Sequence, residues 1–170
     1  MNFALTLDIG IFLAFIAVFL ELRSQRNRDR AQAKREQKRS QFEIYQRLEL
    51  ASIDLHRFEV DHVDLIRPLY TGVGAPTEPA ELKAYHNYVS QILNLFELQV
   101  ELHCNELVEA SILETWLPWF NDVGKAPGFR AVWEAGVGNH YSQRLQRLME
   151  RVIQSDEGIQ PSELRRILVT

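Results

Sequence analysis

The stretch from residue 82 to 107, LKAYHNYVSQILNLFELQVELHCNEL, decides the fold class of this 170-residue chain. Apolar residues recur in it every three or four positions, the spacing of one face of an α-helix: Leu82, Tyr85, Val89, Ile92, Phe96, Val100, His103 and Leu107. A second set broadens this face, namely Leu93, Leu95, Leu98 and Leu102. Such a broad apolar surface predicts a central helix that packs on more than one side.

The segment before this helix has the same period. This period predicts a helix that ends near Pro68. Its apolar face consists of Phe42, Tyr45, Leu48, Ala51, Leu55, Phe58, His62, Ile66 and Leu69. Residues 67–79 contain three prolines and two glycines, so we expect a loop there. Thr77 is expected to cap the central helix.

The segment after the central helix predicts a series of shorter helices. We expect a turn at residues 103–106, a short helix through Ile112 and Trp116 that Pro118 ends or kinks, and a helix that starts at Pro127. A longer helix over residues 141–154 is expected to bury Leu145, Leu148, Met149 and Val152, and Ser162 is expected to cap a last short helix over 163–168. No segment alternates as a strand does, so the sequence predicts an all-α, irregular bundle of about four to six helices.

The amino-terminal stretch MNFALTLDIGIFLAFIAVFLEL predicts a membrane-spanning helix. Ile9 to Leu20 is an uninterrupted apolar run of twelve residues, and Phe3 to Leu22 gives twenty residues, about 30 Å of helix. We expect the apolar residues Phe3, Ile9, Phe12, Phe15, Leu20 and Leu22 to lie within this span. No basic residue precedes the run and no small-residue cleavage site follows it, so we do not expect a cleaved signal peptide. A buried or partner-bound helix is the alternative.

A basic stretch follows this apolar segment directly. Residues 23–39 contain eight basic and two acidic residues, a net charge of +6, and the basic ones are Arg23, Arg26, Arg28, Arg30, Lys34, Arg35, Lys38 and Arg39. The positive-inside rule places this side in the cytoplasm and the amino terminus outside. We expect these residues to set topology and to contact anionic lipid headgroups. Nucleic acid is not expected as a partner, because the stretch has no aromatic residue.

Four segments are therefore expected along the chain. They are a transmembrane helix at 1–22, a basic juxtamembrane stalk at 23–39, a cytoplasmic helical domain at 40–154 and a carboxy-terminal tail with a possible short helix at 155–170. Residues 40–170 contain eleven basic and nineteen acidic residues, a net charge of −8. We expect an anionic membrane surface to attract the stalk and to repel the domain.

Composition excludes several protein classes. Apolar residues make up 46% and charged residues 25% of the chain, which is typical of a globular protein and not of a disordered, collagen-like or polytopic membrane protein. Cys104 is the only cysteine, so there is no internal disulfide framework and no zinc site built on cysteines. The chain has no P-loop, dinucleotide fingerprint, Gly-x-Ser-x-Gly or His-Glu-x-x-His motif. The sequence therefore predicts no catalytic residue, metal site or cofactor.

The stretches LNLFELQVELHCNELVEASILETWLPWF (93–120) and PGFRAVW (127–133) give the chain a resemblance to a known group. The chain resembles small bacterial single-pass membrane proteins whose cytoplasmic helical domain has no known function. The resemblance covers residues 1–155 and implies an anchored helical domain at the bacterial inner membrane. It carries over no active site.

Two groups of residues in the domain are candidate sites. The candidate interaction or pocket residues are Glu97, Glu101, Trp116, Trp119, Phe120, Phe129, Arg130 and Trp133, and the alternative for the aromatic ones is a place in the core. Glu59 and His62 form a Glu-x-x-His as in di-iron bundles, but the second such motif is missing. We interpret these two as ordinary surface or hydrogen-bonded side chains.

The sequence thus favours a non-enzymatic interaction or scaffold module that binds membrane lipid, and either a protein partner or itself. The pair Gly10 and Ala14 would allow two spans to approach closely. The alternative is a ligand-binding sensor or enzyme that uses an aromatic-lined pocket near Trp116, Trp119 and Trp133. A regulator or toxin-like effector that acts through its apolar start is a third hypothesis.

Overall fold

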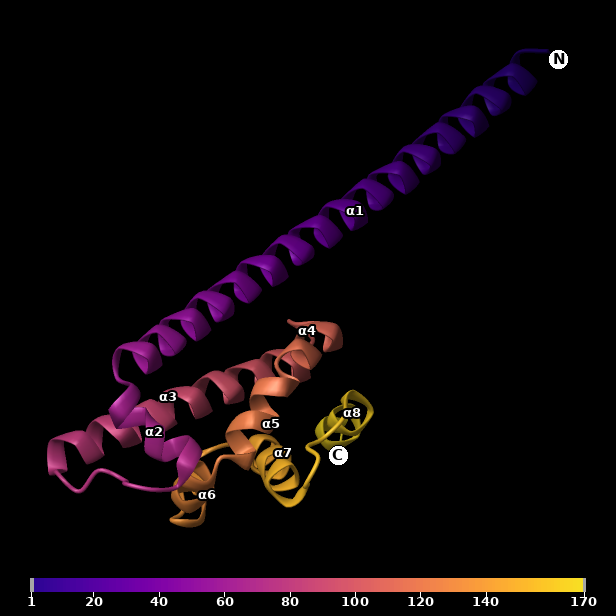
Figure 1. Ribbon diagram of the computed structural model, residues 1–170. Coiled ribbons are helices and arrows are strands. Elements are labelled where there is room, and N and C mark those ends of the chain that lie inside the picture. Colours follow the sequence, from indigo (N-terminus) through magenta and orange to yellow (C-terminus); the bar gives the residue numbers. More distant parts are fainter. Residues whose placement is uncertain (1, 170) are drawn as a thin grey trace. The chain divides into compact units, whose positions relative to one another are not determined.

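The computed structural model describes the backbone of residues 2–169 and the side chains of residues 21–168. In this part of the chain the fold is all-α, as predicted, with eight α-helices, one 3₁₀-helix and no strand. The elements are α1 (Asn2–Asp61), α2 (Val63–Thr71), α3 (Pro79–Cys104), α4 (Ala110–Thr115), α5 (Leu117–Lys125), α6 (Pro127–Glu134), η1 (Val137–His140), α7 (Gln143–Gln154) and α8 (Pro161–Val169). Figure 1 shows their order along the chain.

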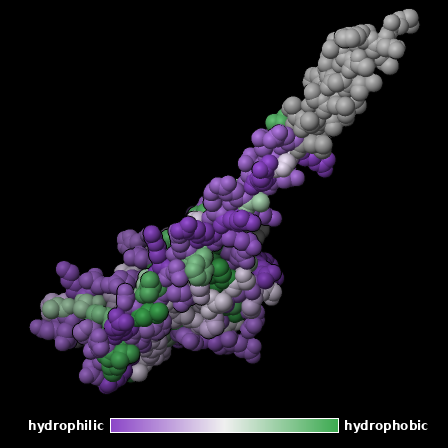
Figure 2. Space-filling view, turned by 90° about the horizontal axis from the view of Figure 1, so that it is seen from above, coloured by the Kyte–Doolittle hydropathy of each residue, from purple (hydrophilic) through white to green (hydrophobic). Residues whose placement is uncertain are grey.

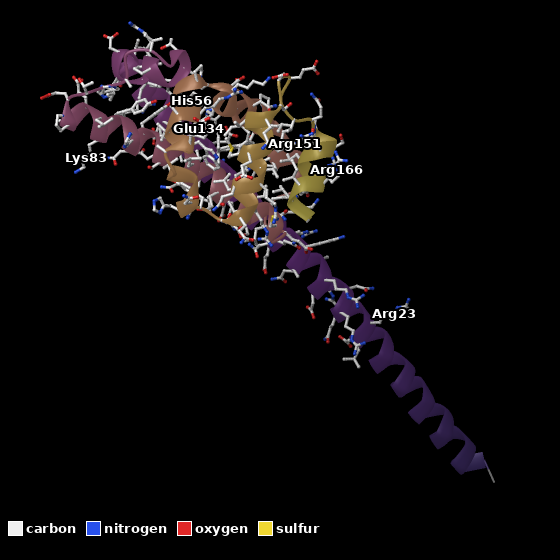
Figure 3. All side chains as sticks on the ribbon, turned by 90° about the horizontal axis from the view of Figure 1, so that it is seen from below. Arg23, His56, Lys83, Glu134, Arg151 and Arg166 are labelled. Atoms are coloured by element: carbon white, nitrogen blue, oxygen red, sulfur yellow. The ribbon has the colours of Figure 1, made fainter. Side chains whose placement is uncertain are left out.

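The chain divides into two compact units, Met1–Ile44 and Tyr45–Thr170, and α1 contributes residues to both. Within the first unit the described side chains of residues 21–40 are exposed, and Figure 2 shows them as mostly hydrophilic. Arg23 projects from the helix in Figure 3. A helix without a buried face depends on contacts along its own surface, such as the ion pair at 3.0 Å between Arg39 and Glu43.

The predicted membrane span at 3–22 falls almost entirely on residues 1–20, whose side chains lie outside the described residues. Among the described residues, no helix is long and apolar enough to cross a membrane.

The second unit is built around α3. Its predicted apolar face is buried at Tyr85, Val89, Ile92, Phe96 and Val100, each at most 3% exposed. α7 packs on α3 and on α5, and Figure 1 shows α8 next to α7. The expected inward residues of α7, namely Leu145, Leu148, Met149 and Val152, are completely buried. These residues confirm the helical periodicity from which the bundle was predicted.

Two glycines allow the helices of this unit to approach closely. A Cβ on Gly124 of α5 would lie 2.4 Å from Cγ1 of Val152 on α7. A Cβ on Gly128 of α6 would lie 2.2 Å from the carbonyl oxygen of Pro68 on α2. Because real Cβ atoms do not come this close to other atoms, a side chain at either position would push the helices apart.

The prediction that the first long helix ends near Pro68 is wrong. The helix breaks at His62, which has φ −127° and ψ 41°, and Pro68 lies inside α2. A proline has no N–H to donate to the carbonyl four residues earlier and its ring must avoid that carbonyl, so a straight helix is disfavoured before it. The structure places the bend six residues upstream, and α2 continues to Gly72, whose φ of 70° ends it.

Other local predictions also need correction. Thr77 does not cap α3, because the cap position is Glu78 and Pro79 starts the helix. Phe42, Leu98 and Leu107 do not face the core, with exposed fractions of 58%, 48% and 45%. The second unit contains seven helices, α2 to α8, besides the end of α1, more than the four to six expected. Pro118 and Pro127 divide the segment after α3 into shorter pieces.

The carboxy-terminal segment packs on the rest of the unit. Asn121 on α5 donates to the carbonyl of Ile159 and accepts from its N–H, at 3.1 and 2.9 Å. Ile159, Leu164 and Leu168 are buried. Ion pairs from Arg151 to Glu163 and from Arg165 to Glu114 join α8 to α7 and α4. The predicted short helix is therefore an integral part of the bundle.

Candidate functional site

Most of the predicted aromatic residues form one ring cluster in the second unit. Trp119 lies 5.0 Å from Phe96 in an edge-on arrangement at 85°, and its ring is 5.5 Å from that of Trp116. Phe120 lies 4.2 Å from Phe96, and both are completely buried. Trp116 is 5% exposed, whereas Trp119 is only half-buried. Trp119 therefore presents part of its ring at the surface.

Trp133 belongs to a different group of contacts. It stacks on Phe129 at 5.8 Å, and a Cβ on Gly138 would lie 2.7 Å from its ring. Arg130 donates from Nε to the carbonyl of Gly124 at 3.1 Å and so satisfies an acceptor at the end of α5. Among the described residues, no ring contact joins Trp133 to Trp116 or Trp119.

The predicted residues Glu97 and Glu101 hold the start of α7. Glu97 accepts a hydrogen bond at 2.5 Å from the N–H of Ser142, the cap residue of that helix. Arg144 forms an ion pair with Glu101 at 3.2 Å. A carboxylate at a helix amino terminus compensates the unpaired N–H groups and the positive end of the helix dipole. These two residues therefore serve the packing of α7 on α3.

A hollow of about 370 Å³ lies beside Trp116 and Trp119, and we name it the aromatic groove. Its lining residues are Tyr45, Glu49, Ser52 and His56 of α1, Thr115 of α4, Trp116 at the junction, and Pro118, Trp119 and Asp122 of α5. All of them belong to the second unit. The groove contains two carboxylates and several aromatic rings but no lysine or arginine.

Hydrogen bonds fix the α1 wall of the aromatic groove. Nδ1 of His56 lies 2.7 Å from the carbonyl oxygen of Ser52, so this nitrogen carries a proton, and the ring is 5.0 Å from Trp119. The Ser52 hydroxyl donates to the carbonyl of Glu49 at 2.8 Å. A hydrogen bond to the Glu49 carboxylate, followed by burial, raises the pKa of Tyr45. The wall thus presents the Glu49 carboxylate to the groove.

Sequence reasoning missed the polar members of the aromatic groove. Tyr45, Glu49, Ser52 and His56 step by four, three and four, the spacing of one helix face. This periodicity was a usable signal for that wall. Nothing local in the sequence indicates that Asp122 lies opposite.

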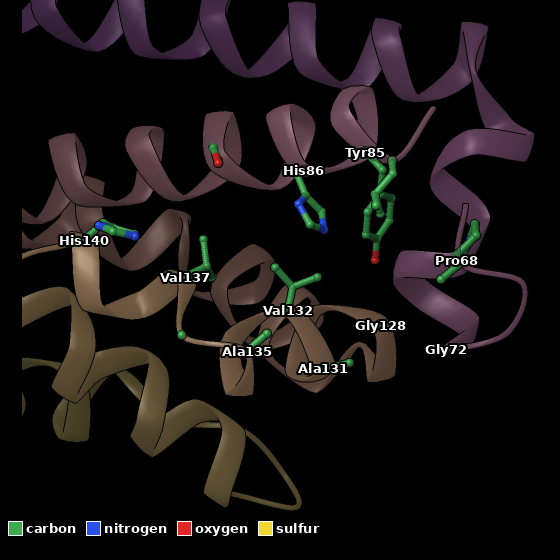
Figure 4. A pocket seen from close by; sticks show the side chains of 14 residues that line it. Pro68, Gly72, Tyr85, His86, Gly128, Ala131, Val132, Ala135, Val137 and His140 are labelled. Atoms are coloured by element: carbon green, nitrogen blue, oxygen red, sulfur yellow. The ribbon is translucent and has the colours of Figure 1, made fainter. Parts of the chain in front are cut away.

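A second hollow, of about 480 Å³, lies between α2, α3, α6 and η1, and we name it the histidine cavity. Its polar members include His86 and His140, and small or aliphatic residues such as Ala131, Val132 and Val137 form much of the rest. Figure 4 shows His86 pointing from α3 toward α6 and Val132 pointing back toward it. The sequence reasoning did not identify this cavity, because its residues come from four separate elements.

Glu59, one half of the Glu-x-x-His motif, belongs to a network of tyrosines. The Tyr88 hydroxyl donates to its Oε2 at 3.1 Å. Burial, and then the charge of Glu59, raise the pKa of Tyr70 to about 12. Burial is also the main reason that the pKa of Tyr88 is raised. His62 does not join this network, and its ring lies 4.3 Å from that of Phe58. In the described part of the chain, no group of three or more histidine, cysteine or acidic side chains is placed to hold a metal.

Cys104 is the last residue of α3 and is half-buried. Burial raises the pKa of its thiol, which lowers the fraction of reactive thiolate.

Comparison with known proteins identifies no relative. A scan against protein-family models, a search of curated proteins and a search of solved structures each found no match.

Proposed function

We propose that this chain is a membrane-anchored interaction module whose helical domain lies on the cytoplasmic side of a bacterial inner membrane. The observation that carries the proposal is the order of two stretches: an apolar run at 3–22 followed by eight basic residues at 23–39. This order is typical of a single span with its amino terminus outside. The exposure of the described basic side chains supports it, because exposed side chains can reach lipid headgroups.

The nature of the domain supports a binding role over a catalytic one. Most of the eight candidate site residues have packing or capping contacts within the unit: Glu97, Glu101 and Arg130 bond to neighbouring helices, and Trp116, Phe120, Phe129 and Trp133 pack against other rings. The aromatic groove, by contrast, has a half-buried tryptophan and two carboxylates at its surface. A surface tryptophan of this kind is a common anchor in protein interfaces. The groove is therefore the best candidate for the contact with a partner.

The anchor is tested by replacing Phe12 and Phe15 together with lysine. A charged residue costs about 2.5–3.5 kcal/mol at the centre of a bilayer, so the variant should leave the membrane pellet after an alkaline wash. The matched control replaces Phe42 and Leu50 of the same helix with lysine. These two residues are 58% and 61% exposed, so the control variant should stay in the membrane pellet. Retention of the Phe12 and Phe15 variant would refute the span.

The orientation is tested by a reporter fused to the carboxy terminus. A reporter that is active only in the cytoplasm should give signal, and one that is active only outside the membrane should not. Reversing the charges of Arg23, Arg26, Arg28 and Arg30 should reduce this difference between the two reporters. An unchanged reporter signal in the charge-reversed variant would remove the main support for this topology.

A ligand-binding sensor is the second candidate function, and the aromatic lining of the groove favours it. About 370 Å³ lies within the range of about 300–1,000 Å³ that is common for small-molecule sites. Native mass spectrometry of the chain purified from its own membranes tests this candidate. A retained small molecule that is lost on replacing Trp119 would favour the sensor over the protein-binding module.

A further inference from the structure

We infer that the aromatic groove binds an arginine side chain carried by a basic segment of a partner protein. This inference deepens the proposed interaction function and rests on it, but it does not depend on the membrane span.

The first argument is the charge of the groove. Glu49 and Asp122 both line it, and neither forms an ion pair with any described residue. Lys125 is three residues from Asp122 and lies with it in a separate shallow hollow, without an ion pair between them. The two carboxylates therefore have their charges available to a cation from outside.

The second argument is the aromatic lining. Trp119 is half-buried, with Phe96 edge-on to it and Trp116 beside it, so packing holds its ring in place. A cation over the face of a tryptophan is attracted by the ring electrons. Tyr45 lines the same hollow next to Glu49. The groove thus combines fixed aromatic rings with two carboxylates that form no ion pair with any described residue.

The third argument is the choice between cations. A guanidinium is planar, stacks on aromatic rings and donates from several N–H groups, whereas an ammonium is a compact and strongly hydrated charge. A groove with two carboxylates beside a tryptophan matches the first better. The net charge of −8 over residues 40–170 would also attract a basic segment over a distance.

The test uses the full chain in detergent micelles, labelled with 5-fluorotryptophan. Its three tryptophans give three ¹⁹F resonances, which single replacements by phenylalanine assign. The probe is the blocked peptide acetyl-GSRSG-amide, and the control peptide has citrulline in place of arginine. Citrulline keeps the shape of arginine but has no charge. The arginine peptide should shift Trp119 and Trp116 with saturation, while Trp133, which contacts neither ring, should not move.

Substitutions identify the carboxylates. Glu49→Gln and Asp122→Asn should each weaken binding about two- to fivefold, as loss of one partly exposed ion pair does. The control is Glu134→Gln, an exposed acidic residue on α6 outside the groove, labelled in Figure 3. It removes the same charge and should leave the affinity unchanged. An unmoved Trp133 resonance in each variant shows that the fold is retained.

Several results would overturn the inference. They are no saturable shift of Trp119, an equal shift with the citrulline peptide, or equal weakening by Glu134→Gln. A Trp119 resonance that changes with protein concentration before any peptide is added would show that a second copy of the chain occupies the groove, and would refute the separate partner. The peptide titration is done in detergent and does not require the chain to be in a membrane. A negative titration would therefore leave the alkaline-wash test of the span unaffected.

Discussion

The two hollows of the second unit differ in chemistry more than in size. The histidine cavity is the larger, at about 480 Å³ against about 370 Å³, yet small apolar residues such as Ala131 and Val132 form much of its wall. The aromatic groove has Glu49 and Asp122 without basic partners, next to Trp119. Volume alone would favour the cavity. Unpaired charge beside a fixed ring gives the groove the more specific recognition chemistry.

The largest expected effect is on the core rings that pack behind Trp119 of the aromatic groove. Phe120→Ala should lower the free energy of unfolding by about 3–5 kcal/mol, because Phe120 is completely buried and packs on Phe96. Urea denaturation followed by circular dichroism measures this loss. Phe42→Ala, the same change at a residue 58% exposed, should stay within about 0.5 kcal/mol. Similar losses in both would mean that the core behind Trp119 gives its ring no rigid support.

The next effect concerns a wall of the histidine cavity. Gly128→Ala should destabilise the protein by about 1–3 kcal/mol, because the new Cβ would lie 2.2 Å from the carbonyl oxygen of Pro68. Glu134→Gln, at an exposed position of the same helix outside the cavity, is the control and should change stability by less than about 0.5 kcal/mol. If Gly128→Ala were neutral in urea denaturation, α2 and α6 would be free to separate and the cavity would have no fixed shape.

The tyrosine network joins α1, which carries the groove, to α3, which carries the cavity. The pKa of Tyr70 is raised to about 12 from 10.0, and that of Tyr88 is also raised, so folding favours their neutral forms. The contribution of these two hydroxyls to the free energy of unfolding is complete below pH 10 and is lost as the pH rises through 12. Urea midpoints of the wild type should therefore fall over this interval.

The variant Glu59→Gln isolates the carboxylate of this network. It should cost about 1–2 kcal/mol at neutral pH, through the weaker bond to Tyr88, and should reduce the loss at alkaline pH. Asp64→Asn, which removes an exposed carboxylate paired with Arg67 on α2, should cost less than about 1 kcal/mol at neutral pH and leave the alkaline transition unchanged. An identical alkaline transition in Glu59→Gln would contradict the contribution of its charge.

The smallest effect is expected from filling the histidine cavity. Val132→Phe adds a ring to a position that points into this space in Figure 4, so stability should change by less than about 0.5 kcal/mol. The ¹⁹F resonance of Trp119 should not move. A shift of that resonance would show that the two hollows are coupled, and their comparison as separate sites would fail.

Periodicity predicted what depends on one helix at a time. The four inward residues of α7 were identified because a buried stripe repeats every three or four positions, and all four are completely buried. The break at His62 was missed because a proline affects the carbonyl only four residues earlier, that of Asp64, and no glycine or proline stands near His62 to mark a break.

Periodicity could not predict which residues come together in the candidate site. Trp116, Trp119 and Trp133 lie close in sequence, but Pro118 and Pro127 start new helices, so the third ring packs on Phe129. Glu49 and Asp122 are 73 positions apart, and only the packing of α1 on α5 brings them to one hollow. Such a pairing has no local signature, since side-chain periodicity describes a single element.

The two side-chain bonds from Asn121 to Ile159 have a consequence for protease digestion. They hold the 155–160 connection, in which Gly158 and Ile159 are buried, against α5. The side-chain bonds of the 72–78 connection come only from Thr71 at the end of α2, which bonds to Val73, and Val73 is 75% exposed. Proteases cut where a segment can unfold into their active site at low cost. A brief digestion should therefore cleave between α2 and α3 first and leave α7 and α8 on one fragment.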